Sequence, residues 1–252
     1  MSPREQTVGS MAVRSWLAAR LTPGGALGLP LTVSFLMIAA AGWGLGELAD
    51  SVRENDDLAA GDAAATAWVV AHRTGGLTAA LRVVTELGGI WMALALVAVA
   101  ALAMPLPGSR WRTAALMVLV SGGTSALVNG VKLLIARPRP TLPDMISAAS
   151  GFSFPSGHSA QAVAAYASLA YLACRRWPVP AVRVSAWAGA GLLVLLVGFS
   201  RLYLGVHWLT DVLGGYLLAA AWATAVWAAV RLATAQRQRR AAVGQDQGTP
   251  EP

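Results

Sequence analysis

The sequence predicts an all-α fold, a polytopic membrane six-helix bundle with both termini cytoplasmic. Of the 252 residues, 56% are hydrophobic and only 12% are charged, and the mean hydropathy is +0.56. These values exclude a soluble globular enzyme and a disordered chain. Six apolar stretches approach the length that a helix needs to cross a hydrocarbon core of roughly 30 Å. Arginines gather in alternate connections between these stretches, as the positive-inside rule predicts.

The six expected helices are separated by connections of unequal length. A basic segment before the first one is also typical of a signal peptide, but further spans follow, so we expect the first helix to be retained. The fourth is short for a bilayer, and its N-terminal turn should lie slightly below the membrane surface. Gly214 and Gly215 in the last helix should allow close packing. The expected ranges are Leu29–Leu48, Leu87–Met104, Thr113–Leu134, Ser159–Cys174, Val184–Leu204 and Leu209–Val230.

The chain divides into three parts by composition. We expect a cytoplasmic N-terminal tail over residues 1–22, a six-helix transmembrane domain over 23–231, and a disordered cytoplasmic tail over 232–252. The last part is polar and rich in Gln and Arg, and it ends in Gly-Thr-Pro-Glu-Pro. Such a composition buries too little apolar surface to fold by itself.

The basic residues orient the expected bundle. The formal net charge is +7, and most of the cations fall in the two tails and in the second-to-third and fourth-to-fifth connections, all on one side of six helices. This side is assigned to the cytoplasm, where anionic lipid attracts cations, so the charge does not indicate nucleic-acid binding. The residues concerned are Arg4, Arg14, Arg20, Arg110, Arg112, Arg175, Arg176, Arg183, Arg231, Arg237, Arg239 and Arg240.

The opposite side receives a long acidic segment, from Glu47 to Glu86. Its acidic residues lack the ligand alternation of an EF-hand, so we expect a solvated loop rather than a calcium site. Within it, Ala63–His72 is apolar enough for a short interfacial helix. Residues 132–158 and 201–208 face the same side, and they contain nearly all the remaining candidates for catalytic or binding chemistry.

The first cluster of such candidates follows the third expected helix, in the run Lys-Leu-Leu-Ile-Ala-Arg-Pro-Arg-Pro that starts at Lys132. Its two prolines stop the helix and hold the chain extended, so that Arg137 and Arg139 project from a stiff backbone. Arginine binds phosphate through two parallel hydrogen bonds, and lysine adds a compact charge. The segment therefore predicts a phosphate site, although anchoring to lipid headgroups explains these three cations equally well.

The second cluster is the turn Phe-Pro-Ser-Gly-His-Ser over residues 154–159, directly before the fourth expected helix. Ser156 and Gly157 suit a helix N-terminus, where free N–H groups and the positive end of the dipole bind anions. His158 would lie at the edge of that site and donate a proton to a leaving oxygen. For this turn taken alone, a polar cap with an unrelated histidine is the alternative.

The third cluster joins the fifth and sixth expected helices and contains Arg201, His207 and Asp211. A spacing of four residues puts His207 and Asp211 on one face of a helix, so the carboxylate can fix the imidazole tautomer and leave the other nitrogen free. This is the orienting arrangement of a catalytic triad, with the histidine available as a nucleophile. The alternative is a buried ion pair that links two helices.

Together the three clusters resemble the type 2 phosphatidic acid phosphatase superfamily, in its membrane branch of bacterial undecaprenyl-diphosphatases and phosphatidylglycerophosphatases. The signature of that superfamily is K-x6-R-P, then P-S-G-H, then S-R-x5-H-x3-D. Lys132 with Arg139-Pro140 matches the first element, residues 155–158 the second, and residues 200–211 the third. Arg137-Pro138 is an extra Arg-Pro one step early, and the spacing assigns the motif position to Arg139.

The resemblance implies a phosphate site without a metal. Three cations and a helix N-terminus would supply the stabilisation that magnesium gives elsewhere, so no cofactor is expected. Vanadate would then inhibit as a phosphate mimic, and EDTA would leave the activity unchanged. The implied phosphate-binding residues are Lys132, Arg139, Ser156, Gly157 and Arg201.

The resemblance also implies three catalytic residues. His207 would attack phosphorus to form a phosphohistidine, and Asp211 would orient it. His158 would protonate the leaving group and then activate the water that hydrolyses the intermediate. Because His207 must be neutral and His158 protonated, a bell-shaped pH profile is expected.

A membrane lipid phosphate is the implied substrate, entering sideways from the bilayer of the cell (inner) membrane into a site on the extracytoplasmic side. The candidates are a polyprenyl diphosphate, phosphatidate and phosphatidylglycerophosphate. An outward-facing site favours polyprenyl diphosphate or a broad lipid phosphatase, by family analogy alone. The alternatives are a lipid phosphotransferase and a catalytically idle membrane scaffold or transporter, but the complete set of motif residues favours the enzyme.

Overall fold

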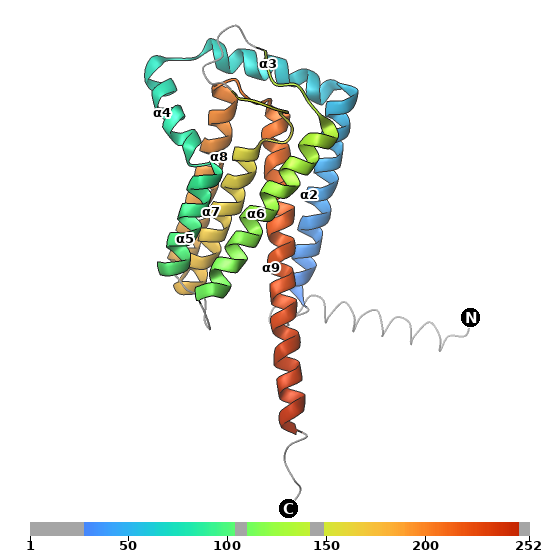
Figure 1. The fold of residues 1–252 in the computed structure, drawn as a ribbon, viewed down its shortest axis with the longest axis vertical. Helices are drawn as coiled ribbons and strands as arrows, with labels where there is room; N and C mark the ends of the chain where they lie inside the picture. The colour runs from blue at the N-terminus through green and yellow to red at the C-terminus, as the bar shows by residue number, and fades with distance from the viewer. Residues whose placement is uncertain (1–27, 104–109, 142–148, 247–252) are drawn as a thin grey trace, which may run out of the picture. The chain divides into compact units, whose positions relative to one another are not determined.

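A computed structural model describes residues 28–103, 110–141 and 149–246 of the chain. Every regular element in these ranges is a helix, which confirms the all-α class (Figure 1). The predicted cytoplasmic tail over residues 1–22 lies outside the described ranges. The helices are α2 (Leu29–Glu54), α3 (Asp57–Ala71), α4 (Gly75–Glu86), α5 (Ile90–Ala103), α6 (Arg110–Ile135), α7 (Gly157–Arg176), α8 (Pro180–Tyr203) and α9 (Leu209–Asp246).

The chain forms two compact units. Residues 40–223 make up one of them, and residues 1–39 with 224–252 make up the other. The first unit holds α3 to α8, the C-terminal part of α2 and the N-terminal part of α9. All three sequence clusters belong to this unit, so the candidate site is built within a single unit.

Each of the six predicted helices has a counterpart, in α2, α5, α6, α7, α8 and α9. The largest difference is at the end of α9, which continues to Asp246. The prediction of a disordered tail over 232–252 is therefore wrong for residues 232–246, and residues 247–252 lie outside the described ranges. Ala, Arg and Gln dominate this stretch. Their high helix propensity continues the helix although the segment is polar.

The acidic segment after α2 is largely helical, so the expected solvated loop is wrong. α3 confirms the short helix predicted over Ala63–His72, but it begins already at Asp57. α4 is absent from the sequence-based prediction, because two glycines and several polar residues interrupt its apolar pattern. The Thr74 side chain caps α4, and α4 joins α5 with a bend of 57°.

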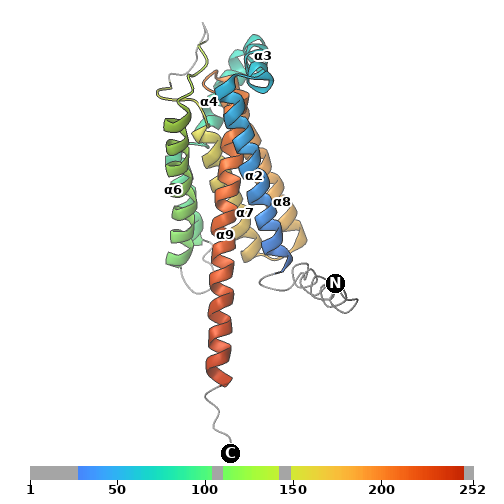
Figure 2. The ribbon, with the colours of Figure 1, turned by 90° about the vertical axis from the view of Figure 1, so that its right-hand side faces the viewer.

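Among the described helices, α2, α6, α8 and α9 are long and apolar enough to cross a membrane, and α4 with α5 would add a fifth, bent span. α7 does not qualify, since it carries polar residues such as Ser159, Gln161 and Ser168. Ten of its 20 residues are buried, because α5, α6 and α8 pack against it. Figure 2 shows α8 alongside α7. A central helix of this kind needs few lipid-facing side chains. Its length of about 30 Å also corrects the prediction of a short fourth helix.

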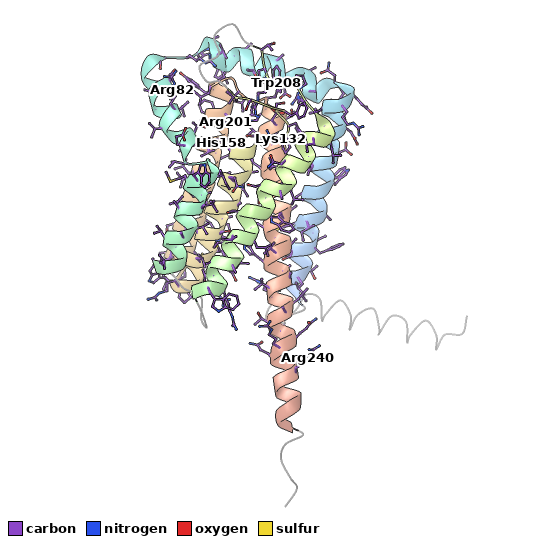
Figure 3. The ribbon with its side chains drawn as sticks, in the orientation of Figure 1. Arg82, Lys132, His158, Arg201, Trp208 and Arg240 are labelled. Atoms are coloured by element: carbon purple, nitrogen blue, oxygen red, sulfur yellow. The ribbon has the colours of Figure 1, made fainter. Side chains whose placement is uncertain are left out.

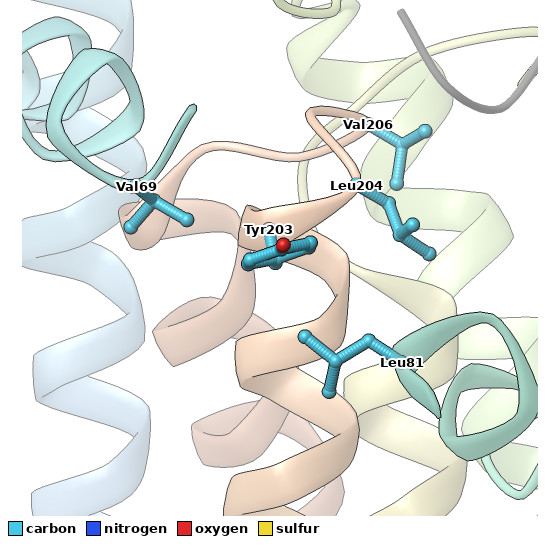
Figure 4. Packing of buried hydrophobic residues seen from close by; sticks show 5 residues of the cluster. All are labelled: Val69, Leu81, Tyr203, Leu204 and Val206. Carbon is cyan, nitrogen blue, oxygen red and sulfur yellow. The ribbon is translucent and has the colours of Figure 1, made fainter. Parts of the chain in front are cut away.

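Tyr203, at the C-terminal end of α8, holds the turn between α3 and α4. Its hydroxyl accepts a hydrogen bond from the Thr74 N–H at 2.8 Å, and its carbonyl oxygen accepts one from Arg73 Nε at 2.8 Å. These bonds fix the end of α8 to the turn between α3 and α4, within the stretch for which the sequence analysis predicts a loop. The Tyr203 ring belongs to a buried cluster with Val69, Leu81, Leu204 and Val206 (Figure 4).

Two glycines of α9 allow the loop before α7 to approach closely, as predicted. A Cβ atom at Gly214 would lie 2.7 Å from Cε2 of Phe154, and one at Gly215 would lie 2.5 Å from the carbonyl oxygen of Ser156. The carbonyl oxygen of Ser156 belongs to the backbone next to the start of α7, so it cannot move aside by a change of rotamer. Gly215 therefore sets the distance between α9 and the N-terminus of α7.

Replacement of Gly215 by Ala should lower the melting temperature of the detergent-solubilised protein. Overpacking of a well-packed region costs about 1–3 kcal/mol. Gly189→Ala is the matched control, because a Cβ at Gly189 in α8 would meet nothing within 4 Å. Equal melting temperatures for the two variants would contradict this account of Gly215.

Candidate active site

The end of α6 turns the chain so that two of the three cations of the first cluster, Lys132 and Arg139, meet. Lys132 lies in the last turn of α6, and Ala136 follows the helix with a positive φ of 50°. This left-handed conformation ends the helix, and Pro138 prevents it from resuming. The extended segment then brings Arg139 back beside Lys132, and the Phe152 carbonyl oxygen accepts from Lys132 Nζ at 2.6 Å and from Arg139 Nη2 at 3.3 Å.

Arg139 also reaches the third cluster. Its Nη1 donates to the Val206 carbonyl oxygen at 2.8 Å and lies 3.2 Å from Nε2 of His207. Further bonds to the carbonyl oxygens of Gly151 and Ser150, each at 3.0 Å, hold the guanidinium in place. The cation is therefore fixed directly beside the imidazole, on backbone oxygens rather than on a carboxylate.

The second cluster is the N-terminus of α7, as predicted. Ser156 is the N-cap, and its Oγ accepts from the Ser159 N–H at 3.4 Å and from the Ser159 hydroxyl at 2.9 Å. Ser156 is fully buried, so its side chain stabilises the turn from within. Gly157 and His158 follow at the first positions of the helix, where backbone N–H groups have no intrahelical acceptor.

His207 and Asp211 meet through a helix cap rather than on one helix face. α9 begins at Leu209, so His207 precedes it and Asp211 lies in its first turn. Oδ2 of Asp211 accepts from the Trp208 N–H at 2.9 Å and lies 3.2 Å from Nδ1 of His207. A carboxylate that reaches back to the N-cap N–H is half of a capping box. The predicted contact is confirmed, and its geometric basis is corrected.

Arg201 contributes a cation from the last turn of α8. Its Nη1 donates to the Thr85 hydroxyl at 2.6 Å. Its Nε is buried and has no hydrogen-bond acceptor among the residues that the structure describes. A buried, unpaired donor on a guanidinium is costly, and it would be satisfied by an anion bound in the site.

The environment of His207 favours its neutral form. Burial lowers the pKa of His207 to about 4, the hydrogen bond and charge of Asp211 raise it, and the charges of Arg201 and Arg139 lower it further. The imidazole is therefore neutral at ordinary pH. With Nδ1 directed at the carboxylate, its remaining lone pair lies on Nε2, next to Arg139.

All eight predicted site residues thus lie together at one end of the helices; Figure 3 labels Lys132, His158 and Arg201 there. A cavity of about 230 Å³ opens beside them and is bounded by Lys132, Gly157 and His158. Its other walls combine polar and apolar residues of the turn between α4 and α5 and of α5, α6 and α7. They are formed by Gly88, Ile90, Ser125, Val128, Asn129 and Gln161.

Two further charged residues reach the site. Arg137, a candidate phosphate-binding cation in the sequence analysis, is instead paired with two carboxylates. Sequence reasoning missed Asp62 altogether. Arg137 Nη1 donates to Oδ1 of Asp211 at 2.8 Å, and its Nη2 donates to Oδ2 of Asp62 at 2.7 Å. The sequence analysis places Asp62 in a solvated loop, yet it is only 2% exposed. The extra Arg-Pro dipeptide was the available signal for Arg137. No sequence pattern connects Asp62 with a segment 75 residues away.

The sequence is similar to several named proteins. Residues 111–235 match the PAP2 superfamily. Phosphatidylglycerophosphatase B of Bacillus subtilis is 38% identical over 137 residues, which cover 54% of this chain and 66% of that protein. Decaprenylphosphoryl-5-phosphoribose phosphatase of Mycolicibacterium smegmatis is 34% identical over 152 residues, which cover 58% of this chain and 74% of that protein. The chain belongs to the PAP2 superfamily.

Solved structures support the same assignment. A crystal structure of a transmembrane PAP2-type phosphatidylglycerolphosphate phosphatase from Bacillus subtilis aligns with a TM-score of 0.70 and 30% identity, over 75% of this chain and 93% of that one. Aquifex aeolicus LpxE aligns with a TM-score of 0.52 over 64% of this chain and 92% of that one, and at 20% identity it shows the fold alone. The PAP2 membership, the names of the relatives and the apolar helices support a multi-pass membrane hydrolase of the lipid phosphatase class.

Orthovanadate, a phosphate mimic, should raise the melting temperature of this PAP2 protein by binding its folded state. Arg139→Gln should remove most of that increase, because it deletes a cation held beside His207. Arg183→Gln, which removes an exposed charge near the start of α8, is the control and should keep the increase. An equal vanadate response in both variants would contradict the assigned anion site.

Proposed function

We propose that this PAP2 protein is a metal-independent phosphatase that removes the terminal phosphate of a membrane lipid through a phosphohistidine intermediate. The observation that carries the proposal is the buried His207, whose Nδ1 lies 3.2 Å from the Asp211 carboxylate and whose Nε2 lies 3.2 Å from the Arg139 guanidinium. A structural ion pair needs no third, cationic neighbour on the other nitrogen. The arrangement suits a nucleophile whose target is an anion.

Substrate binding would use the cations and the start of α7. Lys132, Arg139 and Arg201 surround the position for the phosphoryl group, and Nε of Arg201 supplies an unsatisfied donor. The backbone N–H groups of Gly157 and His158 add the positive end of the α7 dipole. The sequence analysis assigns the Ser156 hydroxyl to the phosphate, but its burial and its bonds to Ser159 support a different role, as the cap that orients these N–H groups.

The chemistry follows from the orientation of the imidazole. In the free site the Nε2 lone pair faces Arg139 at 3.2 Å. When Nη1 of Arg139 exchanges Nε2 for a phosphoryl oxygen, the Nε2 lone pair is free to attack phosphorus. The bonds of Arg139 to backbone carbonyl oxygens stay in place, and Asp211 holds the Nδ1 proton. The bond from phosphorus to the leaving oxygen breaks as the N–P bond forms, and His158 gives its proton to that oxygen. His158 then accepts a proton from the water that attacks the phosphohistidine, which releases phosphate and restores both histidines.

The cavity beside His158 would receive the leaving group. Its walls include Ser125, Asn129 and Gln161, whose hydroxyl and amide groups suit a leaving alcohol that carries hydroxyl groups of its own. The names of both relatives describe phosphate esters of such alcohols, a glycerol and a ribose. A phosphatidylglycerophosphate-type monoester is therefore the first substrate to test, ahead of polyprenyl diphosphate, whose leaving group has no hydroxyl beside the phosphate.

The proposed topology has six spans, with α4 and α5 as one bent span and α7 as the central one. Both termini are then cytoplasmic, and the site opens on the extracytoplasmic side of the inner membrane. Arg175 and Arg176 lie at the end of α7 that is opposite to His158, and Arg183 lies in the first turn of α8. This distribution supports the orientation by the positive-inside rule.

The purified protein should release phosphate from phosphatidylglycerophosphate faster than from undecaprenyl diphosphate or phosphatidate, in buffer that contains EDTA. His207→Ala should abolish release, as removal of a nucleophile does. A faster reaction with undecaprenyl diphosphate would overturn the substrate assignment but keep the phosphatase. Transfer of the phosphate to a second lipid would identify a phosphotransferase instead. Activity lost in EDTA and restored by magnesium would overturn the metal-free mechanism.

The pH profile should show two limbs with separate origins. As the pH falls, kcat/KM should decrease only below about pH 5, because burial lowers the pKa of His207 to about 4 and protonation removes the lone pair. As the pH rises, kcat should decrease when His158 loses its proton in the substrate complex. His158→Gln should abolish the alkaline limb and keep the acid limb. An acid limb near pH 6.5 would contradict the buried, neutral nucleophile.

A further inference from the structure

Asp62 of α3 is linked to Asp211, the carboxylate beside His207, through the guanidinium of Arg137. Arg137 donates to Asp62 at 2.7 Å and to Asp211 at 2.8 Å, and its side chain is only 10% exposed. The two carboxylates are 2% and 0% exposed. A helix that precedes the family motifs in the sequence thus supplies one charge of a buried cluster of three.

Thr210 makes this link rigid. Its N–H donates to Oδ1 of Asp62 at 2.9 Å, and its hydroxyl accepts from Arg137 Nη1 at 2.7 Å and donates to Oδ2 of Asp62. Thr210 directly precedes Asp211 in the first turn of α9. Asp62 is therefore bonded to the same helical turn that positions the Asp211 carboxylate. The Trp208 ring lies 5.5 Å from the Arg137 guanidinium and covers the cluster.

The charges of Asp62, Arg137 and Asp211 together determine the net negative charge next to His207. Arg137 alone would neutralise Asp211 and leave His207 beside a carboxylate with little net charge. With Asp62 present, two carboxylates share one guanidinium, so the cluster keeps a net charge of about −1. In a buried site such a charge interacts strongly with its neighbours, because little water screens it.

We propose that Asp62 is a positioning residue of the phosphatase: by occupying Arg137, it preserves the negative charge of Asp211 that keeps His207 nucleophilic. This proposal rests on the proposed function of His207, but its effect on the imidazole exists without any substrate. Asp62 touches neither the imidazole nor the position for the phosphoryl group. It acts through Arg137 and Asp211.

The other charges around His207 come from every element that packs there. Asp211 of α9 faces its Nδ1, and Arg139 of the segment after α6 faces its Nε2. Further positive or titratable groups come from three helices: Arg201 of α8, His158 of α7 and Lys132 of α6. These neighbours other than Asp211 are cationic or become cationic, and the exposed Glu86 of α4 acts on Arg201. Asp62 therefore supplies a second, buried negative charge next to Asp211.

The test compares Asp62→Asn with Arg137→Gln, because the two changes shift the local charge in opposite directions. Asp62→Asn should lower kcat about tenfold and move the acid limb of kcat/KM to lower pH, since Arg137 then acts on Asp211 alone. Arg137→Gln should move that limb to higher pH by about one unit, since two carboxylates then face His207. The double variant should return the limb toward the wild-type position.

A purely structural role predicts a different result. Both single variants would then lose activity and thermal stability with an unshifted acid limb, and the double variant would be worst. That outcome would overturn the proposal. Glu54→Gln removes an exposed negative charge at the end of α2 and is the matched control, with an unchanged limb expected.

Nitrogen-15 NMR of histidine-labelled protein tests the same claim without catalysis. The chain has only three histidines, so His72→Gln and His158→Gln assign the His207 signals. Arg137→Gln should raise the titration midpoint of His207, and Asp62→Asn should move its Nδ1–H proton upfield as the bond to Asp211 weakens. If these shifts occur in a protein that releases no phosphate, the proposed function is wrong but the role of Asp62 stands. Unchanged signals in an active enzyme would disprove the role of Asp62 alone.

Discussion

The buried carboxylate of Asp211 is the interaction on which the rest of the site depends. Its two oxygens accept from the Trp208 N–H and Arg137 and face Nδ1 of His207, while its backbone carbonyl oxygen accepts from the Ser156 N–H at 2.8 Å. One residue therefore joins the start of α9, the start of α7 and the segment after α6. A fully buried carboxylate is costly unless it is paired and hydrogen-bonded. Each of its partners is consequently fixed in position.

The cations of the site are held differently, and this difference explains their function. Lys132 and Arg139 donate to backbone carbonyl oxygens of Phe152 and Val206, which orient them without neutralising them. Among the residues that the structure describes, Nε of Arg201 has no hydrogen-bond acceptor. Such a site is organised before an anion arrives, so little reorganisation accompanies the development of charge on phosphorus. Carboxylate partners would have fixed the same side chains while cancelling the field that binds phosphate.

Sequence reasoning found the residues of the candidate site more completely than the contacts that surround them. The motif spacing located Lys132, His158 and His207, because each lies where a helix starts or ends and such ends have readable signals. The helix α4 and the role of Asp62 depended on contacts between distant segments, such as the bonds of Asp62 to Thr210, which no local pattern encodes. Hydropathy likewise underestimated α7, since a helix surrounded by other helices has no need of a lipid-facing surface.

The same contacts divide the site into a closed side and an open side. Asp62, Arg137 and Thr210 close the side of His207, the proposed nucleophile, which is only 2% exposed. The cavity borders Lys132 and His158 on the other side. An in-line displacement needs the nucleophile and the leaving group on opposite faces of phosphorus. A lipid that enters through the cavity with its phosphate first meets this requirement, because its leaving oxygen then stays on the side of the proton donor while the buried imidazole approaches from behind.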